Sequence, residues 1–189
     1  PPVNIPIHLE GEEDTPDAGS IDPQTEPKPD LPKPPGAPDL KPKTEERRTP
    51  GFIVLTDDEA LNLRMFKRML DRAATGNQVV TFHQPMDALH FIQANPTKIS
   101  CIVTDFNMKT GMSGADYLAV VKANGAFVWG GQAIVSAHTI EAMREESYAP
   151  DALAILDQLE LGAITYMHKP FKGADLTAWA RKSCPMPLE

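Results

Sequence analysis

Residues 99–108 read Ile-Ser-Cys-Ile-Val-Thr-Asp-Phe-Asn-Met, an apolar run that ends at a carboxylate. A short run of this kind, uncharged and rich in β-branched residues, is typical of a strand in a parallel sheet that is buried on both faces. The carboxylate, Asp105, follows the run directly and would lie at the carboxyl end of the strand. In α/β folds the ligands bind at that end of the sheet. The stretch therefore predicts both a fold class and the place of a site.

The same pattern of an apolar strand followed by a helix repeats along the rest of the chain. The predicted strands are 52–55, 78–82, 99–104, 132–135 and 164–167, and the predicted helices are 61–74, 85–95, 115–122, 151–161 and 174–182. Alternation of this kind implies a parallel sheet with helices on both faces and right-handed crossovers. The sequence predicts an α/β fold, a doubly wound five-stranded parallel sheet of the (βα)5 flavodoxin-like type.

Residues 1–50 differ sharply in composition from residues 51–189. They hold 13 of the 19 prolines, 11 acidic and 6 basic side chains, and none of the aromatic ones. Such a segment cannot bury enough apolar surface to offset its loss of conformational entropy. We therefore predict a disordered, acidic, Pro-rich arm or linker over 1–50 and one folded domain over 51–189.

Charge, hydropathy and cysteine content exclude several classes of function. The net charge of −8 includes −5 on the arm, and neither part carries a basic stripe, so nucleic-acid binding is not expected. No apolar stretch approaches the roughly 20 residues of a membrane span, so this segment is not expected to contact a membrane. The two cysteines suggest no disulfide framework: Cys101 lies in an apolar run and Cys184 near the end. Both fit the reducing environment of the cytoplasm, which is the predicted location.

The polar residues after the predicted strands form one chemical group. Asp57 and Asp58 follow the first strand, Asp105 the third, Ser136 the fourth and Lys169 the fifth. Three neighbouring carboxylates repel one another unless a cation lies among them, and hard oxygen ligands suit Mg²⁺. A lysine and a hydroxyl supply the charge and hydrogen bonds that a phosphoryl group needs, and a carboxylate can be its acceptor. The pattern indicates phosphoryl transfer onto an aspartate.

These motifs resemble those of two-component response-regulator receiver domains. That family has an acidic pair after the first strand, a phosphoacceptor Asp after the third, Ser or Thr after the fourth and Lys-Pro after the fifth. The corresponding segments here are Phe-Ile-Val-Leu-Thr-Asp-Asp-Glu (52–59), Ile-Val-Thr-Asp-Phe-Asn-Met (102–108), Ile-Val-Ser-Ala (134–137) and Gly-Ala-Ile-Thr-Tyr-Met-His-Lys-Pro-Phe (162–171). The resemblance covers about residues 51–182 and leaves the arm unexplained.

The resemblance implies a role for each site residue. Asp105 would attack the phosphorus of a phosphohistidine on a histidine kinase or a histidine phosphotransfer protein. Asp58 and Asp105, with the backbone carbonyl of Asn107, would hold Mg²⁺, and Asp57 would act mainly through bound water. Lys169 would pair with Asp105 before transfer and with the phosphoryl oxygens after it.

The resemblance implies roles for four further residues near the site. Ser136 would hydrogen-bond the phosphoryl group and draw its loop inward. Tyr166 is either the aromatic switch that follows this movement or a packing residue. His138 either tunes hydrolysis of the aspartyl phosphate or is a surface histidine. Pro170 would follow a cis peptide bond that aims the lysine.

Two departures from the family pattern stand out. Lys109 takes the place of a usual proline four residues after the phosphoacceptor, and Gly114 arrives one residue late, so this loop is longer. We interpret Lys109 as a surface lysine rather than a residue that reaches the site. About ten extra residues also lie between the fourth and fifth strands, at 137–149. They predict one or two added helical turns with Thr139 as N-cap and Glu141 in the first turn.

The leading functional hypothesis is a phosphorylation switch that acts on a downstream protein target. An acidic Pro-rich linker before a C-terminal receiver is typical of a hybrid histidine kinase, so the sequence leaves open whether the domain is part of a larger enzyme. A receiver used only as a docking scaffold is the first alternative. An aspartyl-phosphate phosphatase is the second, although such enzymes carry an acid where this chain has Asn107.

Overall fold

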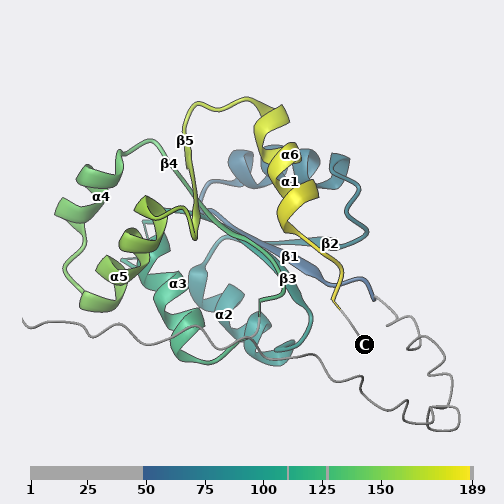
Figure 1. The fold of residues 1–189 in the computed structure, drawn as a ribbon, viewed down its shortest axis with the longest axis horizontal. Coiled ribbons are helices and arrows are strands. Elements are labelled where there is room, and N and C mark those ends of the chain that lie inside the picture. Colours follow the sequence, from purple (N-terminus) through teal and green to yellow (C-terminus); the bar gives the residue numbers. More distant parts are fainter. Residues whose placement is uncertain (1–48, 110, 127, 188–189) are drawn as a thin grey trace, which may run out of the picture. The chain divides into compact units, whose positions relative to one another are not determined.

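The computed structural model describes residues 49–187 except 110 and 127, and it contains the predicted sheet. The strands are β1 (Phe52–Thr56), β2 (Gln78–Phe82), β3 (Ile99–Asp105), β4 (Gln132–Ser136) and β5 (Thr165–His168). The helices are α1 (Ala60–Arg72), α2 (Pro85–Ala94), α3 (Gly114–Ala123), α4 (Ile140–Glu146), α5 (Pro150–Glu160) and α6 (Gly173–Ser183). All strand pairs are parallel, in the order β2-β1-β3-β4-β5 (Figure 1). The predicted fold class is therefore confirmed.

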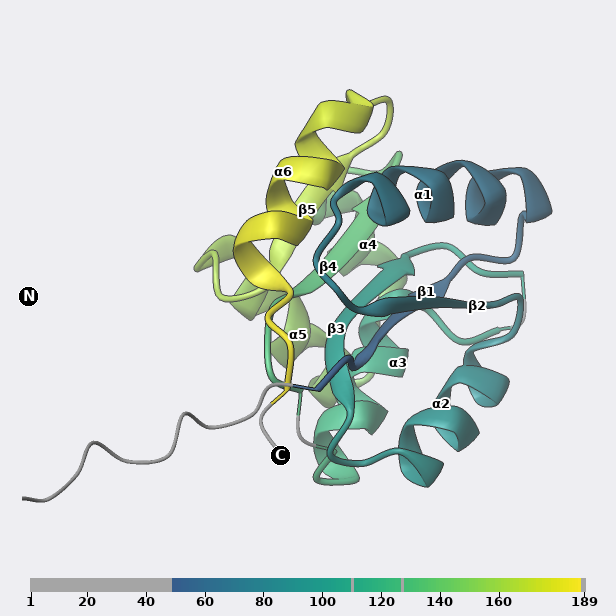
Figure 2. The same cartoon turned by 90° about the vertical axis from the view of Figure 1, so that its right-hand side faces the viewer.

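The helices form two layers, with the sheet between them. Helices α1 and α6 cover one face, and α2, α3 and α5 cover the other (Figure 2). Successive residues of a strand point to opposite faces. Ile53 and Leu55 of β1 accordingly pack with the α1 and α6 core, while Val54 between them packs with the other core. Burial on both faces explains why the central strands read as unbroken apolar runs.

The predicted extra helical turns within 137–149 are present as α4. Thr139 is its N-cap, since the Thr139 hydroxyl accepts a hydrogen bond from the Ala142 backbone amide at 3.3 Å. Met143 is fully buried in the core. The Arg144 guanidinium pairs with two of the carboxylates of α5. These two partners are Asp157 at 2.6 Å and Glu160 at 3.0 Å. The insertion is therefore a helix packed on α5.

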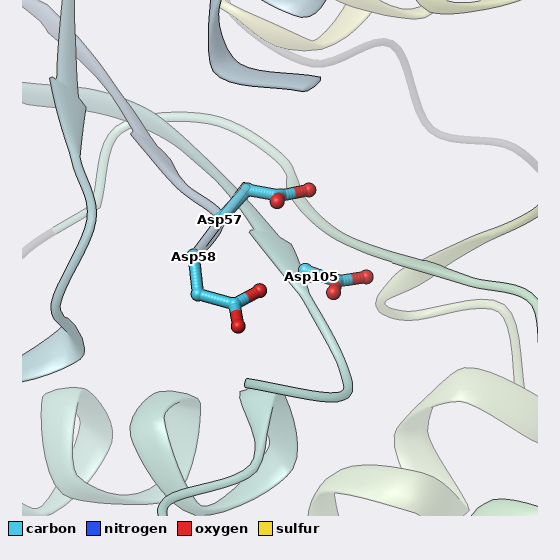
Figure 3. A group of neighbouring side chains, drawn as sticks. All are labelled: Asp57, Asp58 and Asp105. Atoms are coloured by element: carbon cyan, nitrogen blue, oxygen red, sulfur yellow. The ribbon is translucent and has the colours of Figure 1, made fainter. Parts of the chain in front are cut away.

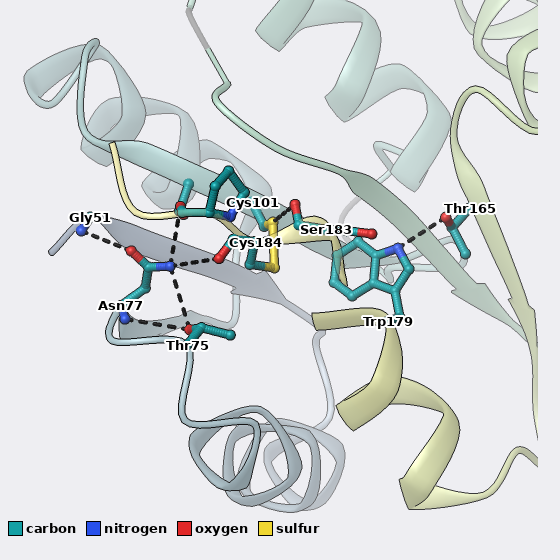
Figure 4. The surroundings of a disulfide bond; sticks show 10 residues. Gly51, Thr75, Asn77, Cys101, Thr165, Trp179, Ser183 and Cys184 are labelled. Carbon is teal, nitrogen blue, oxygen red and sulfur yellow. Dashed lines mark hydrogen bonds between the residues drawn. A yellow bond between two sulfur atoms is a disulfide. The ribbon is translucent and has the colours of Figure 1, made fainter. Parts of the chain in front are cut away.

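The cysteine interpretation is wrong, because Cys101 and Cys184 form a disulfide (Figure 4). Cys101 lies on β3, and the chain after α6 returns across the amino-terminal edge of the sheet. Asn77 fastens this segment: its side chain donates to the carbonyls of Cys184 at 3.0 Å and Pro185 at 3.3 Å, and accepts from the Gly51 amide at 2.9 Å. The two cysteines are 83 positions apart, so only the tertiary fold brings them together.

The predicted arm lies, through residue 48, outside the described residues. Within the part of the chain that the structure describes, none of the helices has the length and apolar character to cross a membrane.

Candidate functional site at the strand ends

Three carboxylates meet at the carboxyl ends of β1 and β3 (Figure 3). Asp57 and Asp58 follow β1, and Asp105 is the last residue of β3, which pairs directly with β1. One carboxylate oxygen from each of the three lies within 4.8 Å of the other two. Asp57 is fully buried and Asp105 is only 9% exposed. Charges this close and this poorly hydrated favour a cation among them, and an all-oxygen set of ligands fits Mg²⁺.

Lys169 supplies a positive charge from the other side of the cluster. Its Nζ donates to Asp105 Oδ1 at 2.8 Å and lies 3.5 Å from Asp57 Oδ2. The backbone amide of Lys169 donates to the Ser136 carbonyl at 2.7 Å, which ties the residue to β4. Its ammonium also lies 5.7 Å from the ring centroid of buried Phe66, a cation–π contact. The peptide bond from Lys169 to Pro170 is cis, as predicted.

Burial and Lys169 act in opposite directions on Asp105. Burial raises the pKa of the Asp105 carboxyl above its ordinary value, and the hydrogen bond and charge of Lys169 offset part of that rise. The pKa stays raised, so ionised Asp105 costs folding free energy. The protonated Asp105 carboxyl therefore contributes to the free energy of unfolding. This contribution is fully present below the ordinary carboxyl pKa and is lost as the pH rises through the raised pKa. A cation bound beside the carboxylate would offset part of this cost.

Asn62 belongs to the site but was missed by the sequence reasoning. Its Nδ2 donates to both oxygens of the Asp57 carboxylate, at 3.2 and 3.1 Å, and to Glu59 Oε2 at 3.2 Å. The Glu59 backbone amide also donates to Asp57 Oδ1, at 2.8 Å. These bonds hold the buried carboxylate in one orientation. The sequence did contain a signal for Asn62. Helix α1 begins only three residues after Asp57, so a polar side chain in its first turn can reach back to the Asp57 carboxylate.

Lys109 is exposed, as the interpretation as a surface lysine requires, but it also reaches Asp58, which that interpretation did not predict. Its backbone amide donates to Asp58 Oδ2 at 3.2 Å, and its Nζ lies 3.7 Å from the same oxygen. The ammonium is also 3.8 Å from Glu59 Oε1. The physical reason is the path of the loop after β3, which brings the backbone of Lys109 beside the acidic segment that follows β1. Asn107, two residues after Asp105, is exposed on the same loop.

Ser136, His138 and Tyr166 form a hydrogen-bonded chain that leads from the end of β4 to α4. The Ser136 hydroxyl, at a position 1% exposed, accepts from the His138 backbone amide at 2.9 Å. The Tyr166 hydroxyl donates to the His138 carbonyl at 2.6 Å. The His138 side chain faces the inserted helix, with Nε2 3.7 Å from Glu146 Oε1. These three residues connect the site to the insertion rather than adding ligands to the acidic cluster.

Most of the residues predicted for the site fall into two groups: the acidic cluster with its lysine, and the chain of Ser136, His138 and Tyr166 that leads away from it. Asp57, Asp58, Asp105 and Lys169 are brought together at the strand ends, with Ser136 at the end of the neighbouring strand. A carboxylate held beside an ammonium and two further carboxylates can act as a nucleophile toward an electrophile that arrives with a cation.

The fold and its strand-end site define a flavodoxin-like α/β domain with an acidic cluster and a paired lysine. The chain belongs to the response regulator receiver domain family, whose family model matches residues 53–181. It is therefore a receiver domain of two-component signal transduction. A comparison with curated protein sequences found no significant match.

Solved structures of receiver domains have the same fold at low sequence identity. A response regulator receiver domain protein from Clostridium thermocellum is 24% identical, with a TM-score of 0.53 over 70% of this chain and 92% of that one. A CheY-like receiver domain protein from Methanospirillum hungatei is 21% identical, with a TM-score of 0.52 over 70% and 92%. The chemotaxis response regulator CheY4 of Vibrio cholerae is 20% identical, with a TM-score of 0.53 over 71% and 98%.

Proposed function

We propose that Asp105 accepts a phosphoryl group from a phosphohistidine of a histidine kinase or histidine phosphotransfer protein, and that the fold then switches its contacts with a downstream protein. The observation that carries the proposal is the 2.8 Å bond between Lys169 and Asp105 inside a cluster of three carboxylates. The proposed setting is the cytoplasm; this proposal rests on the phosphoryl donor, since kinases obtain the group from ATP there, and not on the cysteines, which are paired.

The proposed transfer uses Asp105, Lys169 and a bound Mg²⁺. A carboxylate oxygen of Asp105 forms a bond to phosphorus as the phosphorus–nitrogen bond of the donor breaks, and the electron pair returns to the imidazole nitrogen. The ammonium of Lys169 exchanges its Asp105 oxygen for an oxygen of the arriving phosphoryl group. Mg²⁺ held by Asp58, Asp105 and the carbonyl of Asn107, with Asp57 acting through water, would neutralise charge on the phosphoryl oxygens.

The proposed switch uses the chain of hydrogen bonds from Ser136 to α4. The Ser136 hydroxyl accepts from the His138 backbone amide at 2.9 Å and keeps its own O–H to donate to a phosphoryl oxygen, so a move of Ser136 toward the phosphoryl group would pull on His138. His138 precedes the N-cap of α4, and its carbonyl holds the Tyr166 hydroxyl. A shift at Ser136 would therefore move Tyr166 and α4 together. His138 itself would tune hydrolysis of the aspartyl phosphate, and the target would read α4 and Tyr148, which is 87% exposed.

Beryllofluoride, a phosphoryl mimic, is expected to shift the backbone amide NMR signals of residues 134–146 when it is added together with Mg²⁺. The reason is that α4 is joined to the site through Ser136 and His138. The matched control is beryllofluoride with Mg²⁺ on Asp105→Asn, which should leave these signals in place. Shifts confined to the loop 105–114 would contradict the switch and leave a receiver that does not report through α4.

The donor protein is proposed to dock on α1, which borders the acidic cluster. Helix α1 begins directly after the acidic segment 57–59 and exposes Leu61 at 68% and Met65 at 41%. Residues four apart in a helix share one face, so Arg64 and Arg68 form an exposed basic row beside these apolar side chains. An apolar stripe beside a basic row suits a partner helix whose apolar ridge is flanked by acidic residues.

Reversing the charge of this row is expected to slow transfer from a protein donor but not from a small one. For Arg64→Glu with Arg68→Glu, we expect a loss of tenfold or more in the rate with a phosphorylated histidine phosphotransfer protein, because charge complementarity steers association. The rate with acetyl phosphate should stay within about twofold, since neither arginine belongs to the strand-end cluster. Equal slowing with both donors would show that the substitutions damage the site instead.

A further inference from the structure

We propose that Lys109 is a tethered cation that competes with Mg²⁺ for Asp58 and so sets the Mg²⁺ concentration at which the site fills. The proposal rests on the proposed function in one respect, namely that the acidic cluster binds a metal. It goes further in giving a role to a residue that stands where the family has a proline.

The contacts of Lys109 all converge on the acidic segment after β1. Asp58 Oδ2 receives the backbone amide of Lys109 at 3.2 Å and lies 3.7 Å from its ammonium. The ammonium is shared with Glu59 Oε1 at 3.8 Å. The Asp58 side chain is only 11% exposed, and its carboxylate is one of the three that form the candidate metal cluster. Lys109 therefore partly neutralises the same charge that would hold the metal.

The loop keeps Lys109 in place while leaving its ammonium free to move. Phe106 and Met108, which lie between Asp105 and Lys109 in the chain, are buried. Gly114 at the end of the loop lies against the Asp105 carbonyl, where a Cβ would not fit. The side chain of Lys109 itself is 80% exposed. Because the ammonium is hydrated in either position, moving it away from Asp58 costs little free energy. Lys109 can thus leave Asp58 when a divalent ion arrives, but it returns when the ion dissociates.

The expected size of the effect follows from the exposure of the pair. An exposed ion pair stabilises only weakly, because water and salt screen it. A divalent ion beside the ammonium adds repulsion that a neutral side chain would lack. Together these effects predict that removal of the Lys109 charge tightens Mg²⁺ binding by about threefold to tenfold.

The test is Mg²⁺ titration of the full chain by isothermal calorimetry at low salt, with Lys109→Gln, Lys109→Arg and Lys122→Gln. We expect Lys109→Gln to bind Mg²⁺ about threefold to tenfold more tightly than the natural chain, and Lys109→Arg to bind it as the natural chain does. Lys122→Gln is the control for net charge. Lys122 is an exposed lysine eight residues beyond Gly114 on α3, about 12 Å along the helix, and its loss should leave the affinity unchanged.

Each other result overturns a defined part of the reasoning. Equal affinity of Lys109→Gln and the natural chain, with both phosphorylated on Asp105, would reject the role of Lys109 and leave the proposed function standing. Weaker binding by Lys109→Gln would mean that Lys109 supports the metal loop instead of competing with the metal. Mg²⁺ binding by none of the four proteins would reject the metal site itself, and the inference would fall with it.

Discussion

Asp105→Asn is expected to abolish phosphorylation of this domain by acetyl phosphate, with a loss on the order of a thousandfold or more. An amide has almost the shape of a carboxylate but no anionic oxygen to attack phosphorus. The variant should stay folded, because burial already raises the pKa of Asp105 and disfavours its charged form. The measurement is the hydroxylamine-sensitive phosphate content of the intact protein by mass spectrometry, with thermal unfolding recorded beside it.

The control for this experiment is Asp151→Asn, which removes an exposed carboxylate at the start of α5 and should leave phosphorylation unchanged. Phosphate that persists in Asp105→Asn would contradict the assignment of the acceptor. Asp57 and Asp58 would then be the candidates, since both lie within the same cluster. Peptide mapping after borohydride reduction of the acyl phosphate would decide between them.

The sheet and the acidic cluster could be predicted from sequence because both depend on local patterns. A strand buried on both faces must be apolar along its length, so Ile99 to Thr104 reads as a strand without reference to its neighbours. Parallel strands end at one edge, so a polar residue after each strand is already placed in space. Asp57, Asp105 and Lys169 meet for this reason although more than a hundred positions separate the first from the last.

The features that sequence reasoning missed depend on where loops and termini run. Lys109 contacts Asp58 because the loop after β3 passes beside the end of β1, and no local pattern encodes that path. Asn62 holds the Asp57 carboxylate because α1 begins three residues after Asp57, which places the first turn of the helix next to the end of β1. Composition likewise could not reveal the bond between Cys101 and Cys184, since two cysteines form no recognisable spacing.

Breaking the bond between Cys101 and Cys184 is expected to lower the free energy of unfolding by about 4 kcal/mol, in the chain-entropy account of a loop this long. The bond closes a loop of 83 positions, so its loss restores much conformational freedom to the unfolded chain. For a domain of this size the thermal midpoint should fall by about 10–15 °C. The measurement is guanidinium unfolding of the natural chain with and without a thiol reductant, alongside a count of free thiols under denaturing conditions.

Cys184→Ala is the matched variant. Its guanidinium unfolding midpoint should be close to that of the reduced natural chain and should be the same with and without reductant. Asp105 should still be phosphorylated in the reduced natural chain and in Cys184→Ala. Cys101 precedes Asp105 by four residues on β3, about 13 Å along the strand, so the bond fastens the edge of the sheet opposite the site. Equal stability with and without reductant, or two free thiols in protein purified without it, would refute the stabilising bond. Loss of phosphorylation on reduction, with the fold intact, would instead show that the two ends of β3 are coupled.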